Sequence, residues 1–305
     1  MDFRVLMQER KTLIDKALDY YLPREEEYPQ EIHRAMRYSV FAGGKRIRPL
    51  LTLLTAEIFT PEWKRALPAA CSLELIHTYS LIHDDLPAMD DDEYRRGRLT
   101  SHKVFGEGMA ILAGDALLTL AFELLTDNNK GPSEFDSVYW QEVPPQTKLD
   151  VIFEIAGAAG VRGMIGGQVV DLASEGKKID EQTLEYIEVH KTGALFKAAV
   201  RTGALLAQAD KDSLRRLTVY SSLLGRAFQI VDDLLDVEGS EAKMGKAKGV
   251  DAKKEKATMV SLCGLAEAKS RRDQLYSQSI QELEYYGGKA DQLKKITRFL
   301  LYRDY

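Results

Sequence analysis

Apolar residues recur at three- and four-residue spacing along almost the whole chain, and no segment shows a convincing strand alternation. This is the period of an α-helix that buries one face. It predicts helices near 3–22, 28–42, 48–59, 63–86, 106–126, 147–173, 180–207, 211–236, 256–285 and 288–302. Because no repeat or clear boundary divides the chain, we expect a single all-α domain over residues 1–305.

Two stretches interrupt the helical pattern. Residues 128–146 are polar and contain three prolines, which predicts a surface loop. Residues 237–256 contain three glycines and many lysines, which predicts a second loop. Both lie between helical segments and leave the bundle itself intact.

Composition excludes several classes of protein. A net charge of −5 and the absence of a polybasic tract argue against nucleic-acid binding. Cys71 and Cys263 lie in apolar helical settings without metal-ligand spacing, which predicts reduced core residues. The N-terminal stretch lacks the apolar core of a signal peptide, and no later stretch reaches the roughly 18 clean apolar residues of a membrane span. We therefore expect a cytoplasmic protein that is not an integral membrane protein.

The first candidate site is the aspartate cluster in LIHDDLPAMDDD at 81–92. Crowded carboxylates raise one another's pKa unless cations lie between them, and Mg²⁺ prefers such oxygen ligands. Ideal helix geometry would align Asp91, not Asp90, with Asp84. Pro87 weakens that geometry because it disrupts a helix interior. Asp84, Asp85 and either Asp90 or Asp91 are thus candidate metal ligands, the alternative being a solvated acidic helix end.

The second cluster is FQIVDDLLD at 228–236. Asp232 and Asp236 share a helix face with Gln229, one turn earlier. Apolar neighbours indicate a mostly buried helix, where unpaired charge is costly. Metal ligation by Asp232 and Asp236 explains these carboxylates more simply than chance does.

Two basic segments could bind the phosphate groups of a ligand whose other oxygens are bound to the metal ions. Arg95 and Arg96 follow the first cluster, and guanidinium groups bind phosphate oxygens through a planar fork. AGGKRIRPL at 42–50 combines glycines, which allow close backbone approach, with Lys45, Arg46 and Arg48. Taken alone, Arg95 and Arg96 are better explained as neutralising the acidic residues 90–93, whereas for AGGKRIRPL a solvated basic turn is the weaker alternative.

HKTG at 190–193 breaks a helical pattern. We expect a kink that turns Lys191, Thr192 and unwound carbonyls toward a site, although a plain helix interruption is the simpler alternative. Lys246 and Lys256, in the second predicted loop, could close over a phosphate.

Together these elements resemble the trans-isoprenyl diphosphate synthases, and most closely the bacterial farnesyl diphosphate synthase type. The motifs GGKRIRP, DDLPAMD with two extra residues, RRG, FGEGMAILAGDALL, MIGGQVVDL, HKTG, FQIVDDLLD and GK…KKEKAT occur in the family's order, from about residue 30 to 302. The resemblance implies a helical bundle of the isoprenoid synthase type with a deep central active-site cavity. It also implies a homodimer, with apolar faces around 106–126 as contributors.

The resemblance assigns roles residue by residue. It implies three Mg²⁺ ions, with Mn²⁺ as a substitute, held by Asp84, Asp85, Asp90, Asp232 and Asp236. In the second cluster it implies that Asp232 is the direct ligand and that Asp233 and Asp236 support that ion or its waters. It implies that the allylic diphosphate is bound by Arg95, Lys191, Gln229, Lys246 and Lys256. It implies that isopentenyl diphosphate, without metal, is bound by Lys45, Arg48, His77 and Arg96. Lys191, Thr192 and Gln229 would present dipoles to the allylic cation.

The length of the prenyl product should depend on the size of the side chains that lie one helical turn before the first aspartates. Each helical turn rises about 5.4 Å, close to the length of one isoprene unit. Tyr79 is large and Ser80 is small, and in the family an aromatic residue at this position stops growth at C15. We expect farnesyl diphosphate as the main product, with a C20 geranylgeranyl diphosphate synthase as the alternative.

Three other classes are weaker alternatives. A class I terpene cyclase normally lacks GGKRIRP and the second DDxxD, and a non-catalytic subunit of a heteromeric synthase has usually lost an acidic motif. A di-iron bundle requires two ExxH motifs, whereas Glu74 and His77 form the only one.

Overall fold

The computed structural model describes residues 2–127, 138–238 and 258–302, without the side chains of 138 and 139. In the first half the elements are α1 (Phe3–Tyr21), α2 (Gln30–Val40), α3 (Ile47–Phe59), the 3-10 helix η1 (Trp63–Ala66), α4 (Leu67–Asp84), the antiparallel hairpin β1 (Tyr94–Arg95) and β2 (Arg98–Leu99), α5 (Ser101–Phe105) and α6 (Glu107–Thr126).

The second half continues the helical pattern. Its elements are α7 (Val138–Gln141), α8 (Pro145–Ala159), α9 (Met164–Ser174), α10 (Glu181–Ile187), the π-helix η3 (Glu188–Gly193), α11 (Ala194–Leu206), α12 (Lys211–Glu238), α15 (Met259–Cys263), α16 (Leu265–Glu284), the 3-10 helix η4 (Gly287–Ala290) and α17 (Asp291–Leu301). The all-α prediction is confirmed, while the single domain over 1–305 stays a prediction.

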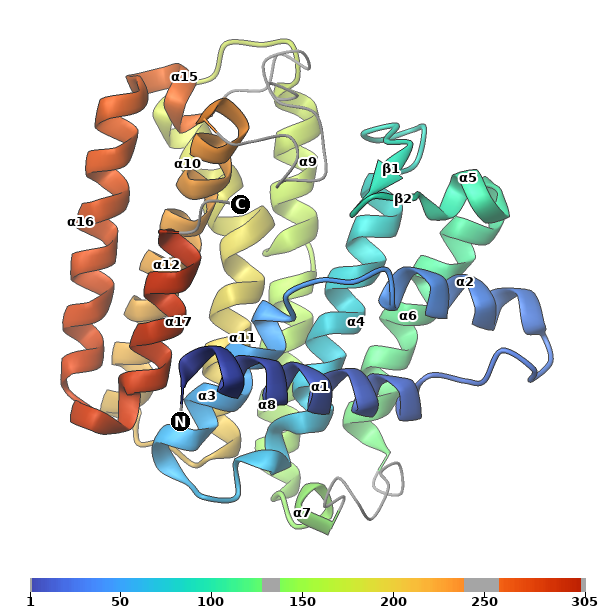
Figure 1. Ribbon diagram of the computed structural model, residues 1–305, viewed down its shortest axis with the longest axis horizontal. Helices are drawn as coiled ribbons and strands as arrows, with labels where there is room; N and C mark the ends of the chain where they lie inside the picture. Colours follow the sequence, from blue (N-terminus) through green and yellow to red (C-terminus); the bar gives the residue numbers. More distant parts are fainter. Residues whose placement is uncertain (1, 128–137, 239–257, 303–305) are drawn as a thin grey trace.

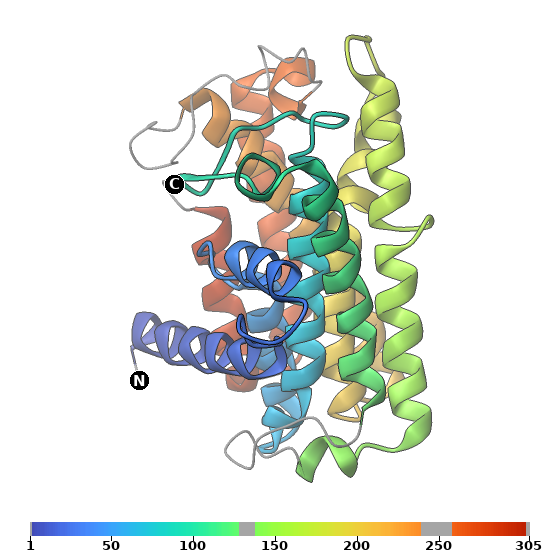
Figure 2. The ribbon, with the colours of Figure 1, turned by 90° about the vertical axis from the view of Figure 1, so that its right-hand side faces the viewer.

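Most long helices run roughly along one direction, and α1 and α2 cross them (Figure 1). Figure 2 shows α1 and α2 on one side of the bundle and α8 and α9 on the other. The hairpin and α15 lie at the same end of the bundle (Figure 1). Helix α4 packs against α6 and α3, and α12 packs against α16 and α11.

Local sequence explains where several helices begin. The Asp180 side chain accepts a hydrogen bond from the backbone N–H of Thr183 at 2.8 Å and caps α10. Thr258 and Ser261 form a reciprocal capping box at α15. Pro68 and Pro145 lie in the first turns of α4 and α8, where a missing N–H costs little.

The structure corrects three expected segments. The helix expected over 147–173 is two helices, with Gly160 and Gly163 flanking the break. The helix expected over 256–285 is interrupted at Gly264, whose φ is 83°. The loop expected over 128–146 is wrong at 138–141, where α7 places Trp140 in the core with 2% exposure, and at 145–146, where α8 begins; residues 142–144 do form a turn. The short hairpin was also not expected, since two-residue strands are too short to show an alternation.

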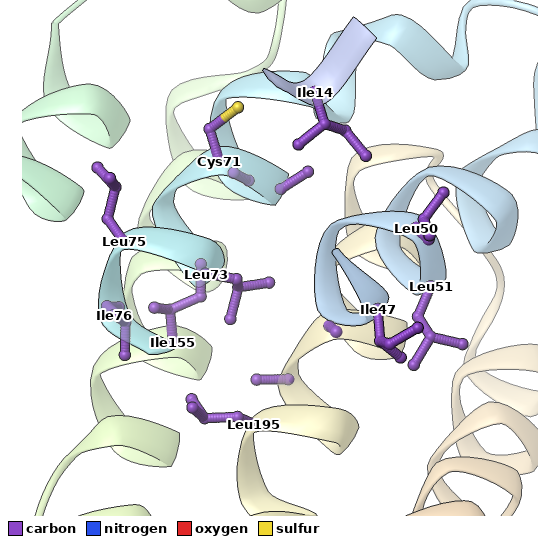
Figure 3. Packing of buried hydrophobic residues seen from close by; sticks show 14 of the residues in the cluster. Ile14, Ile47, Leu50, Leu51, Cys71, Leu73, Leu75, Ile76, Ile155 and Leu195 are labelled. Carbon is purple, nitrogen blue, oxygen red and sulfur yellow. The ribbon is translucent and has the colours of Figure 1, made fainter. Parts of the chain in front are cut away.

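The main core joins helices that are distant in sequence. Figure 3 shows Ile14 of α1, Leu50 of α3, Leu73 of α4, Ile155 of α8 and Leu195 of α11 in one cluster. Each of these side chains is at most 1% exposed. Burying one such side chain contributes about 1.5–3 kcal/mol. This packing fixes α4 in the centre of the bundle and so fixes where its acidic end lies.

Helix α6 is more apolar than we expected from the sequence, since no stretch was expected to reach the hydrophobicity of a membrane span. Within the described residues it is the one helix long and apolar enough to cross a membrane, with a mean hydropathy of 1.7, and 44% of that window is buried. It packs along α4 and α2. Core helices of globular proteins meet the same criterion, and part of the apolar surface of α6 remains exposed, including Ile111 and Leu112.

Candidate active site

The chain turns back sharply after α4. Asp84 is the last residue of the helix, and the backbone N–H of Asp90 donates to its carbonyl oxygen at 2.8 Å. Burial raises the pKa of Asp84 to about 6, Lys191 opposes this shift, and the charge of Asp90 adds to it. Asp91 is exposed, with φ 50°. The chain does not continue as the ideal helix that would align Asp91 with Asp84, and Asp90 lies close enough to act on Asp84.

Asp85 lies on the opposite side of this turn and is 3% exposed. Its Oδ1 accepts a hydrogen bond from Nε of Arg95 at 2.9 Å, and the Arg95 guanidinium also reaches Asp92 Oδ2 at 3.3 Å. Burial raises the pKa of Asp85, and Arg95 partly offsets that effect. Arg95, at the end of β1, is therefore held against the acidic cluster.

The GGKRIRP segment places Arg48 in the lining of a cavity beside Asp84, whereas Lys45 is not among the residues that line it. Arg48 lies over the Phe196 ring at 5.2 Å, and burial lowers its pKa to about 10, which Glu74 and Asp232 partly oppose. Lys45 lies over the ring of Phe299 at 5.9 Å. Arg48 keeps a charge at neutral pH despite its burial.

His77 and Arg96 lie near Arg48. The pKa of His77 lies well below its usual value because the ring is buried and because Arg48 and Arg96 are nearby. The guanidinium of Arg96 donates to the Gly43 carbonyl. A Cβ at Gly44 would lie 2.7 Å from that guanidinium, so only glycine permits this approach. The group that lies close to these glycines in the structure is Arg96, and the close approach of a ligand there stays a prediction.

Arg46 has a structural role in the same segment. It is 3% exposed and adopts φ 52°. Its guanidinium donates to Asp15 Oδ1 at 2.7 Å, to Glu74 Oε1 at 2.8 Å and to the Val40 carbonyl at 2.8 Å. These bonds tie α1, α2 and α4 together and hold the turn that carries Lys45 and Arg48.

The interruption expected at HKTG is the π-helix η3. Gly193 itself is helical, with φ −63°, so the change is a widened turn and not a glycine kink. A Cβ at Gly167 of α9 would lie 2.1 Å from the Lys191 backbone nitrogen, so α9 packs directly on this turn. Lys191 Nζ donates to Asp171 Oδ2 at 2.6 Å.

The second aspartate cluster lies inside α12, behind η3. Thr192 Oγ1 donates to Gln229 Oε1 at 3.0 Å, which joins the two elements. Asp236 is 5% exposed, whereas Asp232 is partly exposed and its charge acts on Arg48. The structure thus brings Gln229 and Asp232 next to the groups that η3 and the GGKRIRP segment present.

A cavity of about 440 Å³ lies between α4, α6, α9 and η3. Its charged and polar lining residues are Arg48, His77, Ser80, His83, Asp84, Asp115, Gln168, Lys191 and Thr192. Its remaining lining is Tyr79, Leu81, Met89, Leu118, Met164, Ile165, Val169 and Leu172. The arrangement suits a ligand with an anionic head and an apolar tail.

Tyr79 and Ser80 both lie in the lining of this cavity. Tyr79 is 5% exposed, and its ring packs edge-on against His83, with centroids 5.7 Å apart. Ser80 donates to the His77 carbonyl at 2.9 Å. The bulk of Tyr79 therefore occupies space just below Asp84.

The sequence reasoning missed several residues of this region. Gln168 and Asp115 line the cavity, and Asp171 pairs with Lys191. Their signal was available in MIGGQVVDL and AGDALL, but no spacing rule connects those segments to HKTG. Lys246 and Lys256, both expected at the site, lie outside the described residues.

Within residues 2–127, 138–238 and 258–302, no group of three or more Asp, Glu, His or Cys side chains is arranged to hold a metal ion unaided. This is compatible with Mg²⁺, which typically uses one or two carboxylates and completes its shell with water and phosphate oxygens. The contribution of the Asp90 charge to the raised pKa of Asp84 is what a bound cation would relieve. The donors present fit a hard divalent ion that arrives with a phosphate ligand.

Comparison with known proteins agrees with this arrangement. The polyprenyl synthetase family model matches residues 29–297. The chain is 48% identical to a farnesyl diphosphate synthase of Geobacillus stearothermophilus (87% of this chain, 86% of the relative) and 44% identical to a geranylgeranyl diphosphate synthase of Cyanophora paradoxa (98% and 95%). Its fold is similar to that of an FPP/GFPP synthase of Zymomonas mobilis, with a TM-score of 0.84, 38% identity and 98% of each chain covered. The bundle, the cavity and these likenesses together show that the chain belongs to the polyprenyl synthetase family, a family of trans-prenyltransferases.

Proposed function

We propose that the protein catalyses Mg²⁺-dependent head-to-tail condensation of isopentenyl diphosphate with dimethylallyl and then geranyl diphosphate, giving (E,E)-farnesyl diphosphate. The observation that carries this proposal is the cavity below Asp84. Its lining combines charged groups, including Asp84, Lys191 and Arg48, with apolar side chains, and Tyr79 adds bulk to that lining. Relatives named for C15 and for C20 products match at similar identity, so a geranylgeranyl diphosphate synthase is the second candidate.

We assign the metal ligands to Asp84, Asp85, Asp90, Asp232 and Asp236. Mg²⁺ bound there would supply Lewis acidity that stabilises the leaving diphosphate. Mn²⁺ accepts the same oxygen ligands and can substitute. Asp85 would have to share its carboxylate with Arg95, which already donates to it.

The two diphosphates would bind different cations. Arg95 and Lys191 lie beside the first aspartate cluster and would hold the allylic diphosphate, together with Lys246 and Lys256. Lys45, Arg48, His77 and Arg96 would hold isopentenyl diphosphate. The low pKa of His77 keeps its imidazole neutral near pH 7, so it can act only as a hydrogen-bond partner and not as a fixed charge.

The chain's own residues would steer the chemistry. The allylic C–O bond breaks and its electron pair leaves with the diphosphate, held by Lys191 and Arg95. The alkene of isopentenyl diphosphate attacks the carbocation, and the released diphosphate accepts the proton that is lost. Thr192 and Gln229 present dipoles to the cation, and the apolar walls formed by Leu118, Val169 and others exclude water.

We further propose a homodimer that forms through α6. Ile111 and Leu112 of α6 are 44% and 56% exposed, and Leu149 and Phe153 of α8 are 59% and 71% exposed. An apolar surface of this kind is typical of interfaces between subunits. Sedimentation should give twice the monomer mass, and a monomer would contradict the assignment.

We assign the reaction to the cytoplasm. Both cysteines are free, and Cys71 is buried in the core. Free thiols are the usual state in reducing compartments. Fractionation of the source cells would test this assignment.

The test is product analysis with isopentenyl diphosphate and, in turn, dimethylallyl, geranyl or farnesyl diphosphate, with and without Mg²⁺. We expect C15 product from the first two starters and little turnover of the third. Conversion of farnesyl diphosphate to C20 would favour the second candidate. No turnover with any starter would overturn the enzymatic proposal and favour a non-catalytic subunit.

A further inference from the structure

A continuous chain of hydrogen bonds runs from the cavity wall into the bundle. Thr192 Oγ1 donates to Gln229 Oε1 at 3.0 Å, and Gln229 Nε2 donates to Asp233 Oδ1 at 3.2 Å. The backbone N–H of Met259 donates to Asp233 Oδ2 at 2.7 Å. Asp233 is 4% exposed. Three elements, η3, α12 and α15, are thus connected by one buried carboxylate.

The direction of every bond in this chain follows from Asp233. An ionised carboxylate only accepts hydrogen bonds, so the Gln229 amide must present its nitrogen to Asp233. The carbonyl oxygen of the same amide then faces Thr192. Because that oxygen can only accept a hydrogen bond, the Thr192 hydroxyl must donate its single proton to it. A group that approaches the hydroxyl oxygen from the cavity, which Thr192 lines, therefore meets lone pairs.

We propose that Asp233 is a positioning residue, which acts through Gln229 to hold the Thr192 hydroxyl with its negative end toward the reacting carbon chain. This inference rests on the proposed prenyl transfer. Developing positive charge on the allylic carbons is stabilised by a dipole already oriented before the reaction, which costs no reorganisation. The middle aspartate of the second cluster thus has a different task from the metal-binding one assigned to Asp232 and Asp236.

Asp233→Asn should reverse the donor and acceptor directions of these hydrogen bonds while leaving a side chain of the same size at position 233. The new amide must offer its oxygen to the Met259 N–H, because two donors would otherwise face each other. Its nitrogen then points to Gln229, whose amide turns over and donates to Thr192. The Thr192 proton is released toward the cavity, where it repels positive charge.

The test is a double-mutant cycle on single-turnover rates with geranyl and isopentenyl diphosphates. Asp233→Asn should lower the rate about a hundredfold, the usual loss when one oriented donor is removed. In a Thr192→Val background the same substitution should lower the rate by much less than a hundredfold, because no hydroxyl remains to be oriented and only the Gln229 dipole is still turned over. In the matched Thr192→Ser background, which keeps the hydroxyl, the large loss should return.

Two results would overturn the proposal. An equal fold-loss in the wild-type and Thr192→Val backgrounds would show that Asp233 does not act through Thr192. A raised Mg²⁺ requirement in Asp233→Asn would show a metal-binding role instead. If Asp233→Asn fails to fold, as judged by thermal melting, Gln229→Met breaks the chain at its centre and should show the same dependence on Thr192. An inactive wild-type protein would refute the proposed function and is seen before any variant is made.

Discussion

The two aspartate-rich segments have similar compositions, but the fold places them in different environments. The first lies at the end of α4, where the chain turns back and Asp84 opens into the cavity beside Asp90. The second lies inside α12, where Asp233 and Asp236 are 4% and 5% exposed and Asp233 holds hydrogen bonds to two other elements. A helix end leaves carboxylates available to ligands, whereas a packed helix commits some of them to the protein. The number of acidic residues in a motif therefore does not give the number of metal ligands.

The largest expected effect is that of Asp84→Asn. Removing a carboxylate charge at the cavity mouth should lower kcat about a thousandfold, at the upper end of losses for one electrostatic group, and should raise the Mg²⁺ requirement. Steady-state assays over a Mg²⁺ titration measure both effects. Asp91→Asn is the matched control: Asp91 is exposed on the same turn, so kcat should change less than about twofold. Equal losses in the two variants would show that the end of α4 does not give Asp84 a role that exposed Asp91 lacks, and so would remove one side of the comparison between the two segments.

The next largest effect is a change in product length caused by a substitution on α4. Tyr79→Ala should lengthen the product from C15 to C20 or beyond, because bulk is removed from the cavity lining just below Asp84. Loss of a buried aromatic side chain should also lower stability by about 3–5 kcal/mol. Ser80→Ala is the control, since it removes one hydroxyl that donates to the His77 carbonyl and should leave product length unchanged. An unaltered product profile in Tyr79→Ala would refute the assignment of Tyr79 as the floor.

The smallest effect concerns Glu188, which lies in η3 on the α12 side and is 1% exposed. Its pKa is raised from an ordinary value near 4.5 to about 8, mainly by burial and with help from the charges of Asp233 and Glu185, while Arg226 and Arg271 oppose the shift. Since the folded state holds the proton more tightly, the contribution of Glu188 to the free energy of unfolding is fully present below pH 4.5 and is lost as the pH rises to about 8. The slope contributed by this one group is at most about 1.4 kcal/mol per pH unit.

Urea unfolding at pH 5.5, 6.5 and 7.5 measures this slope. Glu188→Gln keeps the shape of the side chain without a titrating group, so its stability should depend less steeply on pH than that of the wild type. Parallel pH curves for the two proteins would show that Glu188 does not retain its proton in the fold. A flatter pH curve for Glu188→Gln would sharpen the comparison of the two segments, because it would show a neutral Glu188 carboxyl packed beside the buried Asp233 of the second segment.

Much of the fold could be predicted from local patterns. The spacing of apolar residues predicted nearly every long helix, because a helix that buries one face needs apolar residues every three to four positions along the sequence. The breaks within 147–173 and 256–285 were missed because a few residues between two helices scarcely change that period. The hydrogen-bond partners of Asp85, Lys191 and Thr192 were also not predictable, since each lies on an element distant in sequence.

The sequence alone determined that this chain forms a helical bundle, because helix period is a local property, and its acidic and basic segments were enough to predict a site. Tertiary structure decided how individual residues are used. Arg46 became a buried tie between helices, Asp90 lies beside Asp84, and Asp233 orients Gln229. These outcomes depend on which side chains packing brings within hydrogen-bond distance, and no spacing along one helix specifies a neighbour on another.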